Sequence, residues 1–252
     1  MRIQKKNSME KKTLVIIPAY NEEENITAVI NGIRNAVPGV DILVVNDGGE
    51  DRTGQIVRQL GGRLVNLPYN MGYGAALQTG FKYALKHGYR HVVQIDGDGQ
   101  HDPKDMPRLL NVVSGGEADV AIGSRFLDSR SYKAPLIRRA GMLIFGWLAS
   151  VIIGQRVSDP TSGYQALNSN AIRFYAGDYY PVDFPDADVI IMLYRAGLTI
   201  KEIPVTMYPN PKKSMHAGLK PVYYMFKMLL SILLTLLRKD PLRSESRRDS
   251  PS

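Results

Sequence analysis

Two aspartates two residues apart, Asp96 and Asp98, are the residues whose types and spacing point most directly to chemistry. They follow a short β-branched run, residues 91–93, that predicts a buried strand, and the glycines at 97 and 99 allow a sharp turn close to a ligand. With the amide oxygen of Gln100 they form a hard-oxygen set that suits Mg²⁺ or Mn²⁺. Without a cation, each carboxylate would repel a diphosphate charge about 4 Å away by roughly 4 kcal/mol. A plain acidic turn is the alternative.

Polar residues follow other predicted strands in the same way. The strand over residues 13–18 leads into Ala19, Tyr20 and Glu22, and the strand over residues 41–45 leads into Asn46, Asp47 and Gly48. Open α/β sheets bind ligands at the carboxyl ends of their strands, so these residues are candidates for a binding site. Two alternatives stay open. Asn21 could cap a helix whose first turn holds Glu22–Glu24, and Asp47 could be a turn residue.

Further candidates lie later in the chain. Asn70 and Gly72 open a helix after a strand over residues 63–67, where backbone amides could face a nucleotide. Arg125 follows the strand over residues 119–122 and suits bidentate contact with phosphate. A hydroxyl-rich loop begins at Asp159, and Asp186 and Asp188 open a late helix, where capping would also explain the two acids.

The elements that position these residues alternate between strands and helices over some 120 residues. This alternation predicts an α/β fold with a mostly parallel central sheet and helices on both faces. Thr199 to Met207 is predicted as a final strand. Residues 1–12 are predicted to be a flexible tail and residues 239–252 a disordered one.

Composition limits the kinds of site chemistry and the classes of binding partner that the chain can have. The chain of 252 residues has no cysteine, which excludes disulfides, thiolate metal sites and a cysteine nucleophile. The formal charge of +8 predicts an anionic partner such as a nucleic acid, an acidic membrane surface or a phosphorylated substrate. The basic residues cluster near apolar segments and not along one polar face, which argues against nucleic acid.

Two apolar segments carry those basic residues. Residues 134–154 include Arg138, Arg139 and an uncharged run from Ala140 to Ile153, which suits either a membrane-interface helix or a buried core helix. Residues 211–238 begin with a basic loop containing Lys212 and Lys213. The apolar helix that follows has a narrow polar stripe of Lys227, Ser231 and Thr235. We expect it to lie in a membrane interface, with a span, internal packing or a homodimer contact as alternatives.

Four blocks stand together in a specific order: residues 18–22 (PAYNE), 45–49 (VNDGG), 96–103 (DGDGQHDP) and 161–164 (TSGY). In this order and spacing the chain resembles the family 2 glycosyltransferases with the GT-A fold, particularly the dolichyl-phosphate mannose synthase and polyprenyl-phosphate glycosyltransferase branch. The resemblance covers roughly residues 12–230. It implies a GT-A catalytic domain over residues 13–210 and inverting transfer from a UDP- or GDP-linked sugar with Mg²⁺ or Mn²⁺.

The resemblance also implies roles for the candidate residues. Base and ribose would contact Pro18, Ala19, Tyr20, Glu22, Asn46, Asp47, Gly48, Asn70 and Gly72. Metal and diphosphate would be held by Asp96, Asp98 and Gln100, with Arg125 facing phosphate. Asp159 would lie on the acceptor side, and Asp186 and Asp188 match the family's late acidic pair.

Two departures from the family pattern matter. Asn46 stands where the family usually has aspartate, which leaves the nucleotide open. The family's Arg-x-x-Gly-x-Ser element is absent after the last strand, where Lys212 and Lys213 are the nearest cations.

The acceptor decides the mechanism. A hydroxyl acceptor needs a base, for which Asp159, Asp186 and Asp188 are candidates, whereas a lipid phosphate needs cations and access from a membrane. The apolar segments with Arg138, Arg139, Lys212 and Lys213 favour a polyprenyl phosphate at the cytoplasmic membrane face, reached by a peripheral protein. A polysaccharide or soluble acceptor, or a non-catalytic nucleotide-sugar-binding protein, are the alternatives.

Overall fold

The computed structural model describes residues 13–127, 136–181, 186–208 and 220–237, with only the backbone described for residues 136–143 and 220–226. The predicted tails, Lys212 and Lys213 lie outside these residues. The strands are β1 (Thr13–Ala19), β2 (Asp41–Asn46), β3 (Arg63–Asn66), β4 (His91–Gln94), β5 (Val120–Ser124), β6 (Gln165–Leu167) and β7 (Ile200–Pro204). The helices are α2 (Ile26–Ala36), α3 (Thr53–Gln59), α4 (Tyr73–Lys86), η1 (Pro103–Asp105), α5 (Met106–Ser114), α6 (Leu136–Ile153), α7 (Ser169–Tyr175), α8 (Ala187–Arg195) and α9 (Lys220–Leu237).

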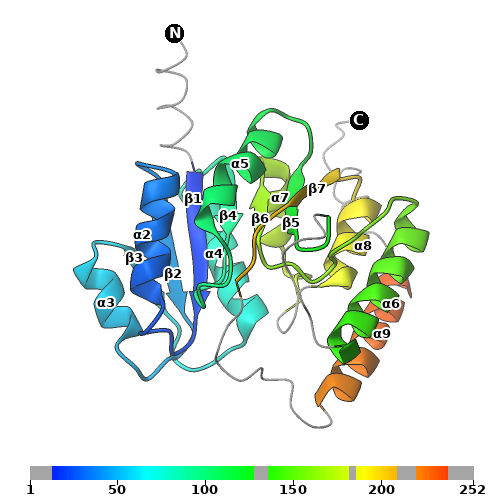
Figure 1. The fold of residues 1–252 in the computed structure, drawn as a ribbon, viewed down its shortest axis with the longest axis horizontal. Helices are drawn as coiled ribbons and strands as arrows, with labels where there is room; N and C mark the ends of the chain where they lie inside the picture. Colours follow the sequence, from blue (N-terminus) through cyan, green and yellow to red (C-terminus); the bar gives the residue numbers. More distant parts are fainter. Residues whose placement is uncertain (1–12, 128–135, 182–185, 209–219, 238–252) are drawn as a thin grey trace, which may run out of the picture.

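The strands form one sheet in the order β3-β2-β1-β4-β6-β5-β7 (Figure 1). All pairings are parallel except those of β6, which runs antiparallel to both β4 and β5. The predicted mostly parallel α/β sheet is therefore confirmed. The short β6 and the helix α7 after it were not predicted, because three residues with no alternation give no periodic signal.

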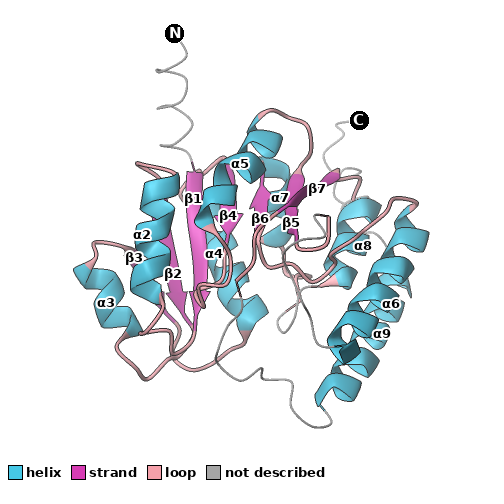
Figure 2. Ribbon diagram, in the orientation of Figure 1, coloured by secondary structure: helices cyan, strands magenta, loops and turns pink. Residues whose placement is uncertain are grey.

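Helices cover both faces of the sheet (Figure 2). Alternate residues of β1 feed two cores, since neighbouring side chains of a strand point to opposite faces. Leu14 and Ile16 pack in the core that includes residues of α4, α6, α7, α8 and α9. Val15 and Ile17 pack in the core that includes residues of α2, α3 and α5. Burial on both faces explains why β1 is an unbroken apolar run.

The first helix begins later than predicted. Helix α2 starts at Ile26, its N-cap is Asn25, and no acid lies in its first turn. The prediction that Asn21 caps this helix is therefore wrong. Asn21 instead adopts a left-handed φ of 56°, and its Oδ1 accepts a hydrogen bond from the backbone N–H of Glu50 at 2.9 Å. This contact ties the loop after β1 to the loop after β2.

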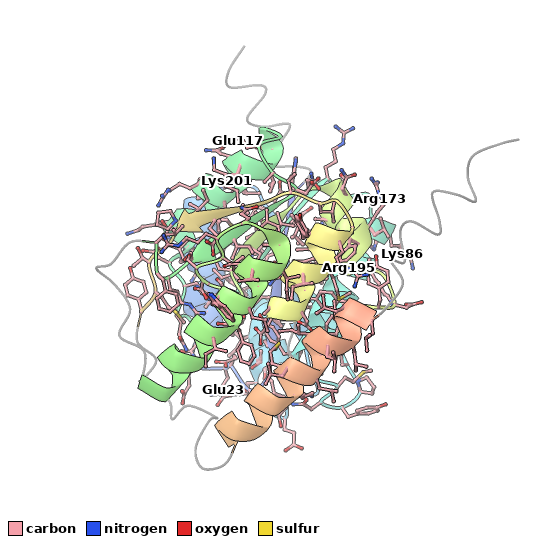
Figure 3. The ribbon with its side chains drawn as sticks, turned by 90° about the vertical axis from the view of Figure 1, so that its right-hand side faces the viewer. Glu23, Lys86, Glu117, Arg173, Arg195 and Lys201 are labelled. Atoms are coloured by element: carbon pink, nitrogen blue, oxygen red, sulfur yellow. The ribbon has the colours of Figure 1, made fainter. Side chains whose placement is uncertain are left out.

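Helices α6 and α9 both pack against α8 and lie on the same side of the molecule (Figure 3). Each contributes inward residues to the core, such as Phe145 and Ala149 of α6 and Met228 and Ile232 of α9. The internal packing predicted as one alternative is thus present along one edge of each helix. Among the described residues, the hydrophobic helices fall short of the length and apolarity needed for a membrane span.

Two members of the polar stripe of α9, Ser231 and the 7% exposed Thr235, face the protein. The hydroxyl of Ser231 donates to a carboxylate oxygen of Asp188 at 2.5 Å, and the backbone oxygen of Thr235 accepts from the guanidinium of Arg195. Among the side chains that the structure describes in α6 (residues 144–153) and α9 (residues 227–237), the exposed ones are apolar. We call this set the apolar face, and its members are Ile144, Trp147, Val151, Leu229, Leu230, Leu233, Leu234, Leu236 and Leu237.

Candidate active site

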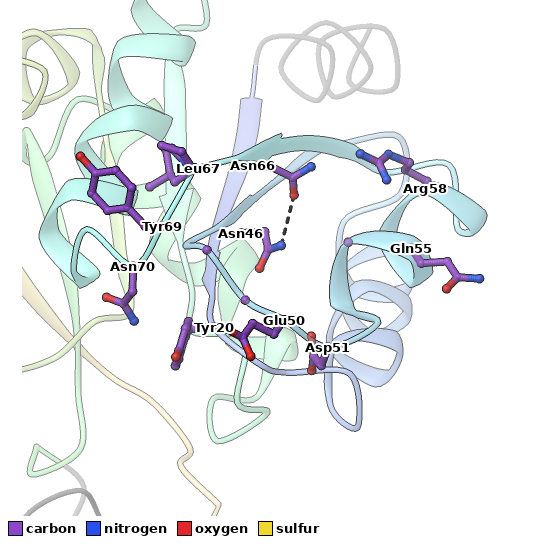
Figure 4. Close-up of a pocket in the computed structure, with 14 residues that line it drawn as sticks. Tyr20, Asn46, Glu50, Asp51, Gln55, Arg58, Asn66, Leu67, Tyr69 and Asn70 are labelled. Atoms are coloured by element: carbon purple, nitrogen blue, oxygen red, sulfur yellow. Dashed lines mark hydrogen bonds between the residues drawn. The ribbon is translucent and has the colours of Figure 1, made fainter.

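The carboxyl ends of β1, β2 and β3 border a pocket of about 690 Å³ (Figure 4). Four of its residues were predicted from the sequence: Tyr20, Asn46, Gly48 and Asn70. Sequence reasoning missed the others, which come from the loop after β2, from α3, and from the end of β3 and the segment after it; among them are Glu50, Asp51, Gln55, Arg58, Asn66 and Tyr69. The lining is mostly polar and carries two exposed tyrosines, a composition that suits a nucleoside.

Asn46 and Asp47 at the end of β2 have different partners. The side-chain amide of Asn46 donates to Oδ1 of Asn66 at 3.1 Å, as the dashed line in Figure 4 shows. The carboxylate of Asp47 accepts from the backbone N–H groups of Met71 and Gly72 at 2.7 and 2.9 Å. Asp47 thus holds the segment before α4 in place, a long-range role that the sequence did not predict.

Pro18, Ala19 and Glu22 lie beside the loop that carries the two aspartates. The backbone oxygen of Pro18 would stand 3.2 Å from a Cβ at Gly97, and that of Ala19 accepts from the N–H of Asp47. The half-buried Glu22 accepts a hydrogen bond from the side chain of Asn25 at 2.7 Å. Glu22 is also close enough to Asp98 for its negative charge to raise the pKa of Asp98. None of these three residues lines the pocket, and their contact with base and ribose stays a prediction.

Asp96 is held on both sides. The hydroxyl of Tyr73 donates to Oδ1 of Asp96 at 2.8 Å, and Nε2 of His101 lies 3.4 Å from Oδ2. Burial disfavours the charged carboxylate, but the hydrogen bonds from His101 and Tyr73 and the positive charge of Arg125 outweigh it, so the pKa of Asp96 is lowered. Asp96 is therefore an ionised carboxylate at neutral pH.

The pKa of Asp98 is shifted in the opposite direction from that of Asp96. Burial and the neighbouring charge of Asp96 raise its pKa, although the backbone N–H of Gln100 donates to it at 3.0 Å. The side-chain amide of Gln100 also donates to Asp98, at 2.7 Å. Gln100, predicted as a metal ligand, here orients Asp98.

The two aspartates fit a divalent cation that is shared with a ligand. The negative charge of Asp96 makes ionisation of Asp98 more costly, and a bound cation would offset that repulsion. Among the described residues, no group of three or more His, Asp or Glu side chains could hold a metal ion. Mg²⁺ and Mn²⁺ typically bind one or two carboxylates together with phosphate oxygens and water, so a pair is a sufficient protein contribution. Asp96 and Asp98 would hold such an ion.

Arg125 and Asp159 form a buried ion pair. The guanidinium donates from Nε and Nη2 to the two carboxylate oxygens of Asp159, both at 2.6 Å. The backbone N–H of Arg125 donates a third hydrogen bond to the same carboxylate. Asp159 is fully buried and Arg125 is only 4% exposed. This geometry turns the two predicted site residues toward each other. Arg125 reaches Thr161 but faces away from solvent, and Asp159 has no open path to an acceptor proton.

Glu202 of β7 supports this pair and was missed in the sequence. Its carboxylate accepts from the backbone N–H groups of Ser158 and Asp159 at 2.9 to 3.0 Å. Burial raises the pKa of Glu202, with these hydrogen bonds acting in the opposite direction. Nothing in the local sequence signals this role, since the loop and β7 are more than 40 residues apart.

Asp186 and Asp188, the late acidic pair, differ in burial and in their partners. Asp188 is buried and accepts from the backbone N–H groups of Asp186 and Val189 and from Ser231, so it joins α8 to α9. Burial raises its pKa. Asp186 is half-buried and close enough to Tyr73 to affect that hydroxyl's pKa. Of the three acids predicted as candidate bases, Asp186 is thus the one whose charge acts on Tyr73, the residue that donates to Asp96.

The segment after β7 returns to the aspartate loop. The backbone N–H of Tyr208 donates to the carbonyl of Gln100 at 2.7 Å, and His101 pairs with Met207. The basic loop containing Lys212 and Lys213 leaves from this point but lies outside the described residues. Arg138 and Arg139 lie in α6, where only the backbone is described.

A family model for glycosyl transferase family 2 matches residues 14–169. This match covers more than half of the chain and contains the pocket and the Asp96–Asp98 pair. The chain belongs to glycosyl transferase family 2. The resemblance inferred from the four sequence blocks is thereby confirmed.

Relatives in this family are named for lipid-linked sugar transfer. The polyprenol monophosphomannose synthase of Mycolicibacterium smegmatis is 33% identical over 209 residues, which is 77% of each chain. The undecaprenyl-phosphate mannosyltransferase of Micrococcus luteus is 31% identical over 209 residues, covering 77% of this chain and 83% of the relative.

A solved structure agrees with the fold. Glucosyl-3-phosphoglycerate synthase of Mycobacterium tuberculosis, in complex with Mn²⁺ and UDP-glucose, superposes with a TM-score of 0.64 at 22% identity, covering 91% of this chain and 82% of that one. This similarity confirms the predicted GT-A fold.

Proposed function

We propose that this glycosyltransferase moves a sugar, with inversion, from a UDP- or GDP-linked donor to a polyprenyl phosphate. The observation that carries the proposal is the placement of the Asp96–Asp98 pair next to a polar pocket of about 690 Å³ that suits a nucleoside. The names of the two mannosyl-transferring relatives support the lipid phosphate acceptor. The Mn²⁺ in the similar structure supports a metal-dependent reaction.

On this proposal, the donor nucleoside occupies the pocket and its diphosphate lies over Asp96 and Asp98. A bound Mg²⁺ or Mn²⁺ would offset the negative charge of the departing nucleoside diphosphate. The chain's own part is to hold the two carboxylates. Tyr73 and His101 keep Asp96 ionised, and Gln100 orients Asp98.

The engagement of the acidic residues favours a phosphate acceptor. A phosphate oxygen is already an anion, so it can attack the anomeric carbon from the face opposite the diphosphate without losing a proton. The bond from the anomeric carbon to the diphosphate oxygen breaks, and its electron pair leaves with the nucleoside diphosphate. Two of the three candidate bases, Asp159 and Asp188, are buried and occupied by Arg125 and Ser231. A hydroxyl acceptor would need a base, for which Asp186 is the remaining candidate.

The apolar face offers a route to a lipid. We propose that it docks on the cytoplasmic membrane surface as a peripheral contact, with Lys212, Lys213, Arg138 and Arg139 serving the anionic headgroups and the acceptor phosphate. On this view, residues 13–210 are the catalytic domain and residues 211–238 form the membrane-associating part. Trp147 is 67% exposed and Leu233 is 53% exposed, and they belong to a set of exposed apolar side chains from two helices on the same side of the molecule, as at membrane or protein interaction surfaces.

A double variant, Trp147→Ser with Leu233→Ser, tests this docking. We expect its partition onto vesicles containing phosphatidylglycerol to fall by about 100-fold or more, because each side chain contributes about 1.5–3 kcal/mol when fully buried in apolar surroundings. Vesicle sedimentation measures the change. Leu85→Ser is the matched control, since Leu85 is 46% exposed on α4. Unchanged vesicle binding together with loss of a solution dimer would assign the face to a homodimer instead.

The reaction itself is tested with purified protein in detergent and Mg²⁺ or Mn²⁺. A panel of labelled UDP- and GDP-sugars is offered with and without polyprenyl phosphate. Label that enters the lipid phase and disappears with chelator supports the proposal and identifies the donor. Metal-dependent donor hydrolysis without lipid product would point to a soluble or polymeric acceptor. Absence of both activities with every donor would favour a protein that only binds nucleotide sugars.

A further inference from the structure

One short segment joins the nucleoside pocket to Asp96. We call residues 69–73 the strap. At one end, Tyr69 and Asn70 line the pocket. At the other end, the hydroxyl of Tyr73 donates to Oδ1 of Asp96 at 2.8 Å. The strap therefore touches both halves of the proposed donor site.

The strap has little freedom to move by itself. Its middle is fixed by the carboxylate of Asp47, which accepts from the N–H groups of Met71 and Gly72. Gly48 packs beneath it with a φ of +67°, and a Cβ there would lie only 2.3 Å from the carbonyl carbon of Tyr69. Because the strap is closely packed, a ligand that displaces Tyr69 or Asn70 also displaces the rest of the strap.

The contact between Tyr73 and Asp96 is equally enclosed. A Cβ at Gly163 would lie 2.6 Å from the hydroxyl oxygen of Tyr73 and 3.0 Å from Oδ2 of Asp96. The backbone at Gly163 therefore covers this hydrogen bond. Because the site is close-packed, a small shift of Tyr73 changes the position of the Asp96 carboxylate.

We propose that Tyr73 is a positioning residue that couples occupation of the nucleoside pocket to the affinity of the Asp96–Asp98 pair for a divalent cation. This inference rests on the proposed function, because it takes the pocket to bind the nucleoside and the pair to bind the metal. It assigns Tyr73, which the sequence did not single out, a role through Asp96. A nucleoside in the pocket shifts the strap as one unit, and the hydrogen bond from Tyr73 carries that shift to the Asp96 carboxylate.

The test uses uridine and guanosine, which lack phosphates and cannot act as diphosphate ligands of the metal. Free Mn²⁺ is measured by electron paramagnetic resonance while the full chain is titrated with and without a saturating nucleoside. We expect the better-bound nucleoside to tighten Mn²⁺ binding about fivefold or more in the wild type, a typical size for coupling between two sites. In Tyr73→Phe we expect less than about a twofold effect, with nucleoside binding retained in calorimetry.

Tyr89→Phe is the matched control, since the Tyr89 hydroxyl also donates to an aspartate, Asp41, at 2.8 Å. It should keep the wild-type coupling. The proposal is overturned if neither nucleoside changes the Mn²⁺ affinity of the wild type, whether or not Tyr73→Phe folds. Coupling that survives in Tyr73→Phe overturns it as well. If neither UDP nor GDP binds with Mn²⁺, the proposed donor site itself fails, which is a different result.

Discussion

An Asp98→Ala variant is expected to lose sugar transfer by about a thousandfold, equivalent to about 4 kcal/mol of activation free energy. Asp98 lies beside Asp96, and burial and that neighbouring charge raise its pKa. Removal of its carboxylate leaves one acid to hold the metal against the departing diphosphate. The measurement is the initial rate of transfer from the donor identified in the panel, at saturating Mn²⁺.

Two further variants interpret the result. Asp98→Asn keeps the shape of the side chain and the hydrogen-bonding partner of Gln100, so a similar loss there attributes the effect to the charge. Asp178→Ala removes a carboxylate whose side chain is 98% exposed and paired with Lys82 on the surface, and should keep full activity. Retention of more than about a tenth of the rate in Asp98→Ala would remove the aspartate pair from the mechanism.

The second large effect is on stability. Replacement of Asp159 by alanine is expected to destabilise the fold by about 3–5 kcal/mol, because it leaves the buried charge of Arg125 without its partner. For a chain of this size the melting temperature should fall by about 6–20 °C. Thermal unfolding followed by circular dichroism measures the shift.

Controls separate the charge from the packing. The double variant Arg125→Met with Asp159→Leu removes both charges and should recover most of the loss, since apolar replacement of a buried pair is often neutral. Lys201→Met breaks the surface ion pair with Glu117, which is half-exposed on both sides, and should cost less than about 1 kcal/mol. A stable Asp159→Ala protein that has lost transfer would restore Asp159 as a candidate base.

Tertiary contacts reversed the prediction of which side of α9 is exposed to water. The spacing of Lys227, Ser231 and Thr235 predicted a polar stripe on α9, which in an interfacial helix would face water. In the fold, the Ser231 hydroxyl donates to the buried Asp188 of α8, and Thr235 is only 7% exposed, so both residues are turned away from water. The leucines are left on the outside.

The sequence alone determined the layered fold and the edge of the sheet at which the candidate site is proposed. Unbroken apolar runs such as Thr13–Ala19 can be satisfied only by burial on both faces of a sheet, and polar residues that follow such strands must gather at one edge. The local pattern around Asp96 and Asp98 therefore sufficed to predict a hard-oxygen site there.

Only the tertiary structure decided which candidates are partners of each other. Asp159 and Arg125 are 34 residues apart, and Asp188 and Ser231 are 43 apart, so no local pattern links them. A buried carboxylate and a candidate base look the same in a sequence, because the residue type fixes the charge but not what neutralises it. Tyr73 became visible as a contact of Asp96 only when α4 and β4 were packed together, since its position in the chain carries no chemical signal.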